Sequence, residues 1–271
     1  MYTLLPRETE PRLHRSVAIH DGWPCLQMRT CIIIPSYNHG ETLPGVVRAA
    51  REYHPVIVVD DGSSDGSEQS LRSADCAALI RHPRNMGKCV ALRAGFDSAI
   101  AMGFTHAITM DADGQHSALD IPVLETVAER SPGAFIVGVR EIAKAGAPAE
   151  RQVANRISNF WFRVETGISL IDTQCGLRCY PLAITRSLRT RAARYGYELE
   201  ILIRAVWAGH ELVAVPVRVD YAAPSSRRSH FRPLLDFARI SCIHASFSFQ
   251  SVCLPASLRK SLSVAAGAHP E

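Results

Sequence analysis

Short, uninterrupted runs of apolar residues that end at polar or acidic side chains restrict the fold of this chain more than any other feature. Residues 31–34 (CIII), 56–59 (VIVV) and 107–110 (AITM) are three such runs. Runs this short and this apolar are typical of strands that are buried on both faces of a sheet. Segments that favour helices separate the runs, and this alternation predicts a parallel sheet with right-handed crossovers.

The polar residues after these runs are expected at one edge of the sheet, because such sheets bind ligands beyond the carboxyl ends of their strands. Asp111 and Asp113 directly follow the third run, and residues two positions apart point to the same side of an extended backbone. Two such carboxylates suit a hard cation, which can in turn bind phosphates. A calcium loop does not fit, because its sixth position should be glycine and is His116, and the P-loop spacing is absent around Lys88.

Composition excludes several functional classes. The 271 residues are 47% hydrophobic and 21% charged, which is enough for one large α/β domain. A net charge of +4 and an aromatic content of 7% predict no nucleic acid partner. The eight cysteines are scattered without a CxxC pair, so reduced cytosolic thiols are expected. No signal peptide and no membrane-spanning helix are expected, which predicts a cytoplasmic location.

The chain is expected to divide into three segments. Residues 1–29 form an irregular lead-in, residues 30–223 the main domain, and residues 224–271 a basic loop followed by an amphipathic helix from Pro233. Within the main domain, Arg140 ends a strand over 134–139, a helix covers about 151–166, and a polar loop covers 172–178. A further strand is expected over 212–219.

Taken in order and spacing, these pieces resemble family 2 glycosyltransferases of the GT-A fold, and in particular the dolichyl- or polyprenyl-phosphate sugar synthase branch. The resemblance covers about residues 30–223 and rests on Ile33-Ile-Pro-Ser-Tyr-Asn38, Val58-Val-Asp-Asp-Gly-Ser-Ser-Asp-Gly66, Asn85-x-Gly-Lys88, Met110-Asp-Ala-Asp-Gly-Gln-His116, Gly138-x-Arg140, Asp172-Thr-Gln-Cys-Gly-Leu-Arg178, Tyr197-Glu-Leu-Glu200 and Val215-Pro-Val217. It implies an α/β fold with a Rossmann-like, mostly parallel central sheet, flanking helices and a small antiparallel extension.

The resemblance also implies roles for single residues. Those expected to bind the donor nucleotide are Pro35, Tyr37, Asn38, Asp61 and Lys88. Those expected to hold Mg²⁺ or Mn²⁺ on its diphosphate are Asp111, Asp113 and Gln115. Arg140 and Arg151 would lie near the phosphate of the acceptor or donor, and Arg178 would close over the site with the basic residues 227–232. The sequence departs from the family at Leu177, where Phe is usual, and at His230, where the lipid-phosphate enzymes often carry Lys.

The implied reaction is metal-dependent, inverting transfer of a sugar from a UDP- or GDP-linked donor to a polyprenyl phosphate or another lipid-linked acceptor. A lipid phosphate is already ionised at neutral pH and needs no base, whereas an alcohol needs one, for which Asp172 is the candidate. Residues 227–260 carry Arg and Lys beside Phe, Leu and Ile. This segment would contact the inner face of the cytoplasmic membrane peripherally or pack on the main domain, and both interpretations stay open.

Three alternative functions remain. The first is transfer to a hydroxyl of a glycan or of a small or lipid alcohol. The second is a nucleotidyltransferase, although such enzymes usually have a Gly-rich loop after the first strand, where this chain has Pro35-Ser-Tyr-Asn38. The third is an inactive sugar-nucleotide binding protein, which the presence of both carboxylates argues against.

Overall fold

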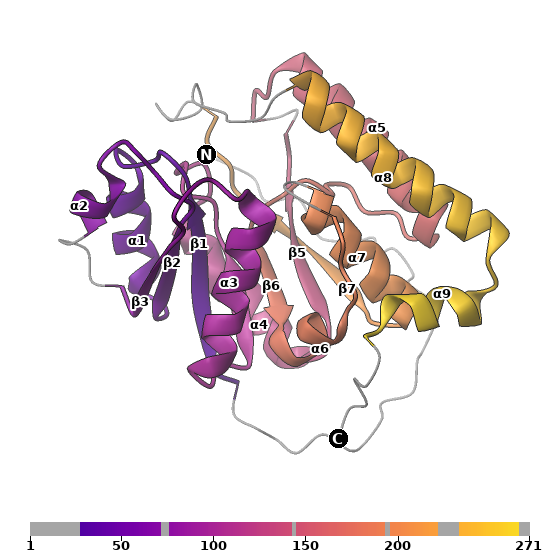
Figure 1. The fold of residues 1–271 in the computed structure, drawn as a ribbon, viewed down its shortest axis with the longest axis horizontal. Helices are drawn as coiled ribbons and strands as arrows, with labels where there is room; N and C mark the ends of the chain where they lie inside the picture. Colours follow the sequence, from indigo (N-terminus) through magenta and orange to yellow (C-terminus); the bar gives the residue numbers. More distant parts are fainter. Residues whose placement is uncertain (1–27, 72–75, 143–144, 193–195, 222–232, 266–271) are drawn as a thin grey trace, which may run out of the picture.

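A seven-stranded sheet forms the centre of the computed structural model, which describes residues 28–71, 76–142, 145–192, 196–221 and 233–265 (Figure 1). The strands follow the order β3-β2-β1-β4-β6-β5-β7. They are β1 (Thr30–Ser36), β2 (Val56–Asp60), β3 (Ala78–Arg81), β4 (His106–Thr109), β5 (Phe135–Arg140), β6 (Arg178–Pro181) and β7 (Leu212–Val217). Only β6 is antiparallel to its neighbours, β4 and β5. The predicted mostly parallel α/β sheet with a small antiparallel extension is confirmed.

Helices cover both faces of this sheet because successive side chains of a strand point to opposite sides. In β1, Ile33 packs in the core under α3 and α7, and its neighbours Ile32 and Ile34 pack in the core under α1 and α4. The helices are α1 (Leu43–Arg51), α2 (Ser67–Leu71), α3 (Lys88–Ala101), η1 (Ala118–Asp120, a 3-10 turn), α4 (Ile121–Arg130), α5 (Ala149–Thr166), α6 (Leu182–Ser187), α7 (Gly196–Ala208), α8 (Pro233–Cys253) and α9 (Ala256–Ser263).

The antiparallel strand β6 was not predicted as a strand, because it has only four residues and ends in a proline, which cannot donate to the sheet. Its direction matters for the site. Arg178, at its start, pairs with Thr109 at the end of β4, and the Thr109 hydroxyl donates a hydrogen bond of 2.7 Å to the Gly176 carbonyl. The loop 172–177 is thereby held beside the carboxyl end of β4.

The tail from Pro233 forms two helices where one was expected. α8 ends at Cys253, and α9 follows Pro255, which has no N–H with which to continue a helix and disfavours helical backbone in the residue before it. α8 packs along α5, and α9 packs against α7 (Figure 1). Within the described parts of the chain, no helix has the length and apolar character needed to cross a bilayer. The lead-in up to residue 27 and the basic residues 227–232 lie outside the described residues.

The close contact of α3 with β1 and β2 is made at Gly95. A Cβ at this position would lie 2.5 Å from Ile33 Cγ2 and 3.3 Å from Val59 Cγ2. We expect Gly95→Ala to lower the free energy of unfolding by about 1–3 kcal/mol through overpacking. Gly45→Ala in α1 is the matched control, because nothing lies within 4 Å of the added Cβ. Its better helix propensity should raise the free energy of unfolding by about 0.5–1 kcal/mol. Urea unfolding measures the free energy of unfolding of both variants. Equal changes in the two variants would contradict the tight packing of α3.

Candidate active site

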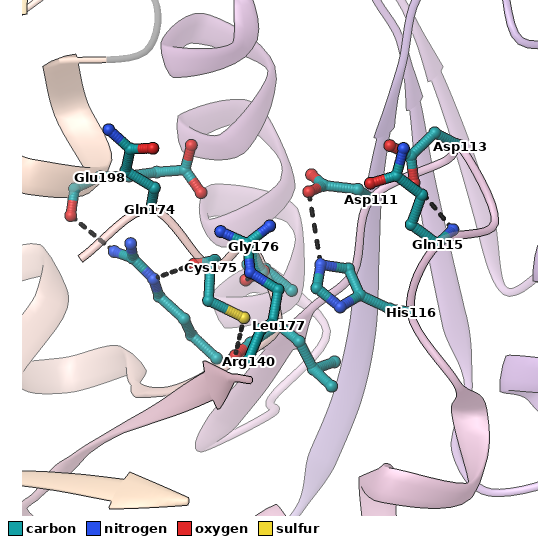
Figure 2. A network of polar contacts seen from close by, with 12 residues as sticks. Asp111, Asp113, Gln115, His116, Arg140, Gln174, Cys175, Gly176, Leu177 and Glu198 are labelled. Atoms are coloured by element: carbon teal, nitrogen blue, oxygen red, sulfur yellow. Dashed lines mark hydrogen bonds and ion pairs between the residues drawn. The ribbon is translucent and has the colours of Figure 1, made fainter. Parts of the chain in front are cut away.

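The carboxyl ends of β1, β2 and β4 place the predicted polar segments at one edge of the sheet. In the register of the sheet, Ser36 pairs with Asp60 and Ile33 with Thr109, so residues 35–38, 60–62 and 111–113 all follow strands that end on the same side. Figure 2 shows Asp111, Asp113, Gln115 and His116 on the turn that follows β4. The expectation that the polar chemistry gathers at this edge is therefore met for these three segments.

Asp111 lies at the centre of the contacts at this edge. Its Oδ1 accepts a hydrogen bond of 2.6 Å from the Lys88 ammonium. Its Oδ2 lies 3.6 Å from His116 Nε2, as Figure 2 shows. Burial alone would raise the pKa of Asp111, but Lys88 and His116 hold that pKa well below its usual range. Gly176 lies against the same carboxylate, since a Cβ at this position would overlap with both carboxylate oxygens. Only a glycine leaves room for Asp111 there.

The residues at this edge fit a divalent cation. Burial and the nearby Asp111 carboxylate raise the pKa of Asp113, because two negative charges close together repel each other. A cation bound between the two carboxylates would remove this repulsion. Gln115 is buried, and its backbone N–H donates 3.0 Å to Asp113 Oδ1. In the described residues, no three His, Cys, Asp or Glu side chains gather as a complete metal site. Two carboxylates and an amide suit Mg²⁺ or Mn²⁺, because such ions take their remaining ligands from waters and substrate phosphates.

Glu198 is a member of the site that the sequence analysis did not assign. Its Oε2 lies 3.0 Å from Lys88 Nζ, so the ammonium group bridges Glu198 on α7 and Asp111 after β4. The Tyr197-Glu-Leu-Glu200 stretch, part of the family resemblance, could have pointed to Glu198 as a site residue. Its two acids, however, are also explained by their place at the positive end of a helix dipole. The two acids have different partners: Glu200 accepts hydrogen bonds from Arg204 and from the backbone N–H groups of residues 191 and 192.

Arg140, at the end of β5, and Asp172, at the start of the loop 172–177, form a second charged pair. Asp172 is fully buried and accepts hydrogen bonds from Arg140 Nε (2.6 Å), from Arg140 Nη2 (3.0 Å) and from Asn155 Nδ2 (2.7 Å). Burial would raise the pKa of Asp172, but the hydrogen bonds from Arg140 hold that pKa below its usual value. The backbone N–H groups of Arg140 and Gln174 donate to it as well, and a buried carboxylate with five donated hydrogen bonds and a low pKa is a poor general base. These contacts favour a role for Asp172 in orienting Arg140, and its role as a general base stays a prediction.

Arg178 does not close over the site as expected. The side chain is fully buried, and its guanidinium donates to three backbone carbonyls: those of Cys175 at 2.7 Å, Thr173 at 2.8 Å and Glu198 at 2.5 Å. Buried arginine is tolerated only when such partners satisfy its donors. Arg178 therefore fixes the loop 172–177 against the start of α7, and a motif position alone does not reveal that burial.

The segments expected to bind the nucleotide lie at the ends of β1 and β2. Pro35 is buried and Tyr37 half-buried, and Asn38 has a left-handed φ of 56° while its side chain accepts a hydrogen bond of 2.8 Å from Ser64 N–H. Asp61 is buried and accepts from the N–H groups of Met86 (2.9 Å) and Gly87 (2.6 Å). The Asp61 carboxylate thus holds the loop before α3. An open pocket of about 280 Å³ lies beside it, lined by Gly62, Ser63, Arg81, His82 and Pro83.

Arg151 lies in the first turn of α5, with its guanidinium 5.4 Å from the centre of the Tyr221 ring. Arg140 is held instead by the buried Asp172 carboxylate. In the described part of the chain, neither guanidinium forms a hydrogen bond or ion pair with Asp111.

Two comparisons with known sequences agree with this geometry. The family model described as "Glycosyl transferase family 2" matches residues 31–188. A polyprenol monophosphomannose synthase of Mycolicibacterium smegmatis is 28% identical over 203 residues, which cover 70% of this chain and 76% of that protein. An undecaprenyl-phosphate mannosyltransferase of Micrococcus luteus is 29% identical over 204 residues, which cover 70% of this chain and 83% of that protein.

The fold is also similar to solved structures. A glucosyl-3-phosphoglycerate synthase from Mycobacterium tuberculosis, crystallised with Mn²⁺, UDP and glucosyl-3-phosphoglycerate, matches with a TM-score of 0.59 and 17% identity. The match covers 84% of this chain and 81% of that one. At this level of identity the likeness shows a shared fold.

The bridge made by Lys88 can be tested by its effect on stability. We expect Lys88→Met to lower the free energy of unfolding by about 1–3 kcal/mol, because it leaves the Asp111 and Glu198 carboxylates facing each other without a cation. Lys260→Met, at an exposed position of α9, is the matched control and should change the free energy of unfolding by less than about 0.5 kcal/mol. Urea unfolding at neutral pH is the measurement. A Lys88→Met protein as stable as the control would show that the bridge contributes nothing.

Proposed function

Because this chain belongs to glycosyl transferase family 2, we propose that it transfers a sugar, with inversion, from a nucleoside-diphosphate sugar to a polyprenyl phosphate. The observation that carries the proposal is the placement of Asp111 and Asp113 at the carboxyl end of β4, beside Lys88 and Glu198. The names of two relatives, a polyprenol monophosphomannose synthase and an undecaprenyl-phosphate mannosyltransferase, support the class of acceptor.

The proposed donor site uses the edge formed by β1, β2 and β4. Residues 35–38 and the pocket beside Asp61 would receive the base and ribose, and Asp111, Asp113 and Gln115 would hold Mg²⁺ or Mn²⁺. When bound, the ion would neutralise the negative charge that develops on the departing diphosphate. Lys88 adds a fixed positive charge beside the same carboxylate, which favours an anionic leaving group.

The proposed acceptor site lies near Arg140 and Arg151. An inverting transfer requires the acceptor to attack the anomeric carbon from the face opposite the diphosphate. A phosphate monoester already carries the negative charge needed for attack, so positioning by guanidinium groups suffices. The burial and low pKa of Asp172 favour this acceptor over an alcohol, because an alcohol would need a general base.

Contact with a membrane surface is part of the proposal, because polyprenyl phosphates are lipids. We place the protein at the inner face of the cytoplasmic membrane as a peripheral enzyme. The described tail supports this location through α8, which exposes Phe249 (66%) and Val252 (80%) while it packs along α5.

A donor and acceptor screen tests the proposal directly. Purified protein is incubated with labelled UDP- and GDP-sugars, with Mg²⁺, Mn²⁺ or a chelator, and with or without polyprenyl phosphate. We expect labelled lipid only when both the cation and polyprenyl phosphate are present. Label that appears on soluble alcohols instead would replace the lipid acceptor by a hydroxyl acceptor, and transfer in the presence of the chelator would contradict the role of Asp111 and Asp113.

Loss of either carboxylate should stop this transfer. We expect Asp111→Asn and Asp113→Asn each to lower kcat by about 10²–10³, because the charge on the diphosphate is no longer balanced. Asp97→Asn, at an exposed position on α3, is the matched control and should leave kcat unchanged. A further readout is Mn²⁺ binding followed by electron paramagnetic resonance, which should weaken in both site variants. Normal turnover by Asp113→Asn would sink the proposed metal site.

Asp172→Asn separates an orienting role from a general base. If Asp172 orients Arg140, the variant should raise KM for polyprenyl phosphate by about tenfold and leave the shape of the pH–rate profile unchanged. A general base would give a different result: a fall in kcat of about 10²–10⁴ and loss of the acidic limb of the profile. Steady-state kinetics over a range of pH distinguish the two, with Arg140→Lys as the companion variant that keeps the charge but loses the two-point contact.

A further inference from the structure

The outward face of α5 is apolar and stays exposed in the part of the chain that the structure describes. Val153, Ile157, Phe160 and Val164 follow the helical spacing i, i+4, i+7 and i+11, so their side chains share one face. Their exposed fractions are 52%, 40%, 59% and 44%. We call these four residues the α5 stripe. Trp161, at 38%, lies beside it and packs edge-on against Phe160.

The inward face of α5 is mostly polar, and Phe162 is its one fully buried apolar residue. The Asn155 amide donates a hydrogen bond to Asp172. The Ser158 hydroxyl lies 3.3 Å from His244 Nε2, and the buried Glu165 carboxylate lies 2.9 Å from His244 Nδ1. A surface helix ordinarily turns its apolar side inward and its polar side to water. This helix shows the reverse over much of its length, so the α5 stripe is suited to an apolar environment outside the protein.

The charges beside the α5 stripe identify the kind of surface it fits. Arg156 and Arg163 are exposed on α5, and the one exposed acid of the helix is Glu150 in its first turn. The described side chains of α8 at 241–253 include no Asp, Glu, Lys or Arg. A second copy of this chain would bring arginines against arginines, whereas an anionic lipid surface complements them. Aromatic and aliphatic side chains beside basic ones are typical of helices that lie in the membrane interface.

We propose that the α5 stripe, with Arg156 and Arg163, binds the surface of an anionic phospholipid bilayer. This inference rests on the proposed lipid-linked acceptor and assigns the contact to α5 within the main domain, whereas the sequence analysis looked for it in the tail. Figure 1 shows α5 and α8 side by side along the border of the molecule, remote from α1 and α2.

The position of α5 connects this surface to the proposed acceptor site. Arg151 lies in its first turn, and Asn155, one turn later, binds Asp172, which in turn binds Arg140. A bilayer that holds α5 in its interface therefore lies close to the two arginines that would receive a lipid phosphate. The chain of contacts makes the helix both the membrane contact and a support of the site.

Vesicle co-sedimentation in the absence of donor, acceptor and metal tests this proposal apart from catalysis. The probes are phosphatidylcholine vesicles with and without phosphatidylglycerol. We expect the protein to sediment with the anionic vesicles. Ile157→Ser combined with Phe160→Ser should weaken this binding by about tenfold or more, because it removes exposed apolar surface from the α5 stripe. Urea unfolding of this variant checks that the loss of the Phe160–Trp161 contact leaves the protein folded. Arg156→Gln and Arg163→Gln should each weaken it by about fivefold.

The matched control removes exposed apolar side chains elsewhere. Leu119 and Val123, 61% and 48% exposed, belong to η1 and α4, and α4 covers the other face of the sheet. Leu119→Ser combined with Val123→Ser should bind vesicles like the unchanged protein. Equal binding by all variants, or equal loss in the control, would overturn the proposal. A third outcome would also overturn the proposal: the unchanged protein forms a dimer and does not bind vesicles, and the stripe variant is a monomer. The α5 stripe would then be a contact with a second copy of the chain.

The same variants keep this inference distinct from the proposed function. Transfer to a short-chain, water-soluble prenyl phosphate should be unchanged in the stripe variant, because no membrane is needed. If vesicle binding depends on the α5 stripe but no transfer occurs with any donor, the proposed function fails and the surface stands. If transfer occurs but the stripe variants bind vesicles as well as the unchanged protein does, the function stands and this inference fails.

Discussion

The ammonium group of Lys88 is the interaction on which the arrangement of the candidate site depends. It joins the start of α3, the turn after β4 and the start of α7, because Asp111 and Glu198 both lie within 3.0 Å of its nitrogen. Two carboxylates held this close would repel each other strongly without a cation between them. The positive charge therefore sets the spacing between the sheet edge and α7, and the site takes its shape from that spacing.

The irregular loop 172–177 is held by buried charges in the same way. Arg178 satisfies the carbonyls of Thr173, Cys175 and Glu198, and Asp172 collects donors from Arg140 and Asn155. Burying a charge without partners is costly, so each of these groups is fixed by several contacts. The loop can then place Gly176 directly against Asp111 without regular secondary structure of its own.

The sequence predicted the strands of the sheet more reliably than the contacts of individual side chains. Uninterrupted apolar runs at 31–34, 56–59 and 107–110 identified β1, β2 and β4, because strands buried on both faces tolerate little else. Strand β6 was missed, since four residues that include an arginine and a proline carry no such pattern. The burial of Arg178 and the pairing of Glu198 with Lys88 arise from elements far apart in the sequence. Local patterns contain no information about such contacts.

The antiparallel strand β6, inserted between β4 and β5, has a consequence for the order in which this protein is made. β1, β2 and β4 pair only with one another and with β3 until residues 178–181 have been synthesised. During that interval the other edge of β4 carries unpaired backbone groups, and such edges recruit strands from other chains. The partly made protein therefore has an additional open sheet edge while residues 110–177 are being translated. The edge of β4 is covered first, and the site is completed only when Glu198 on α7 follows.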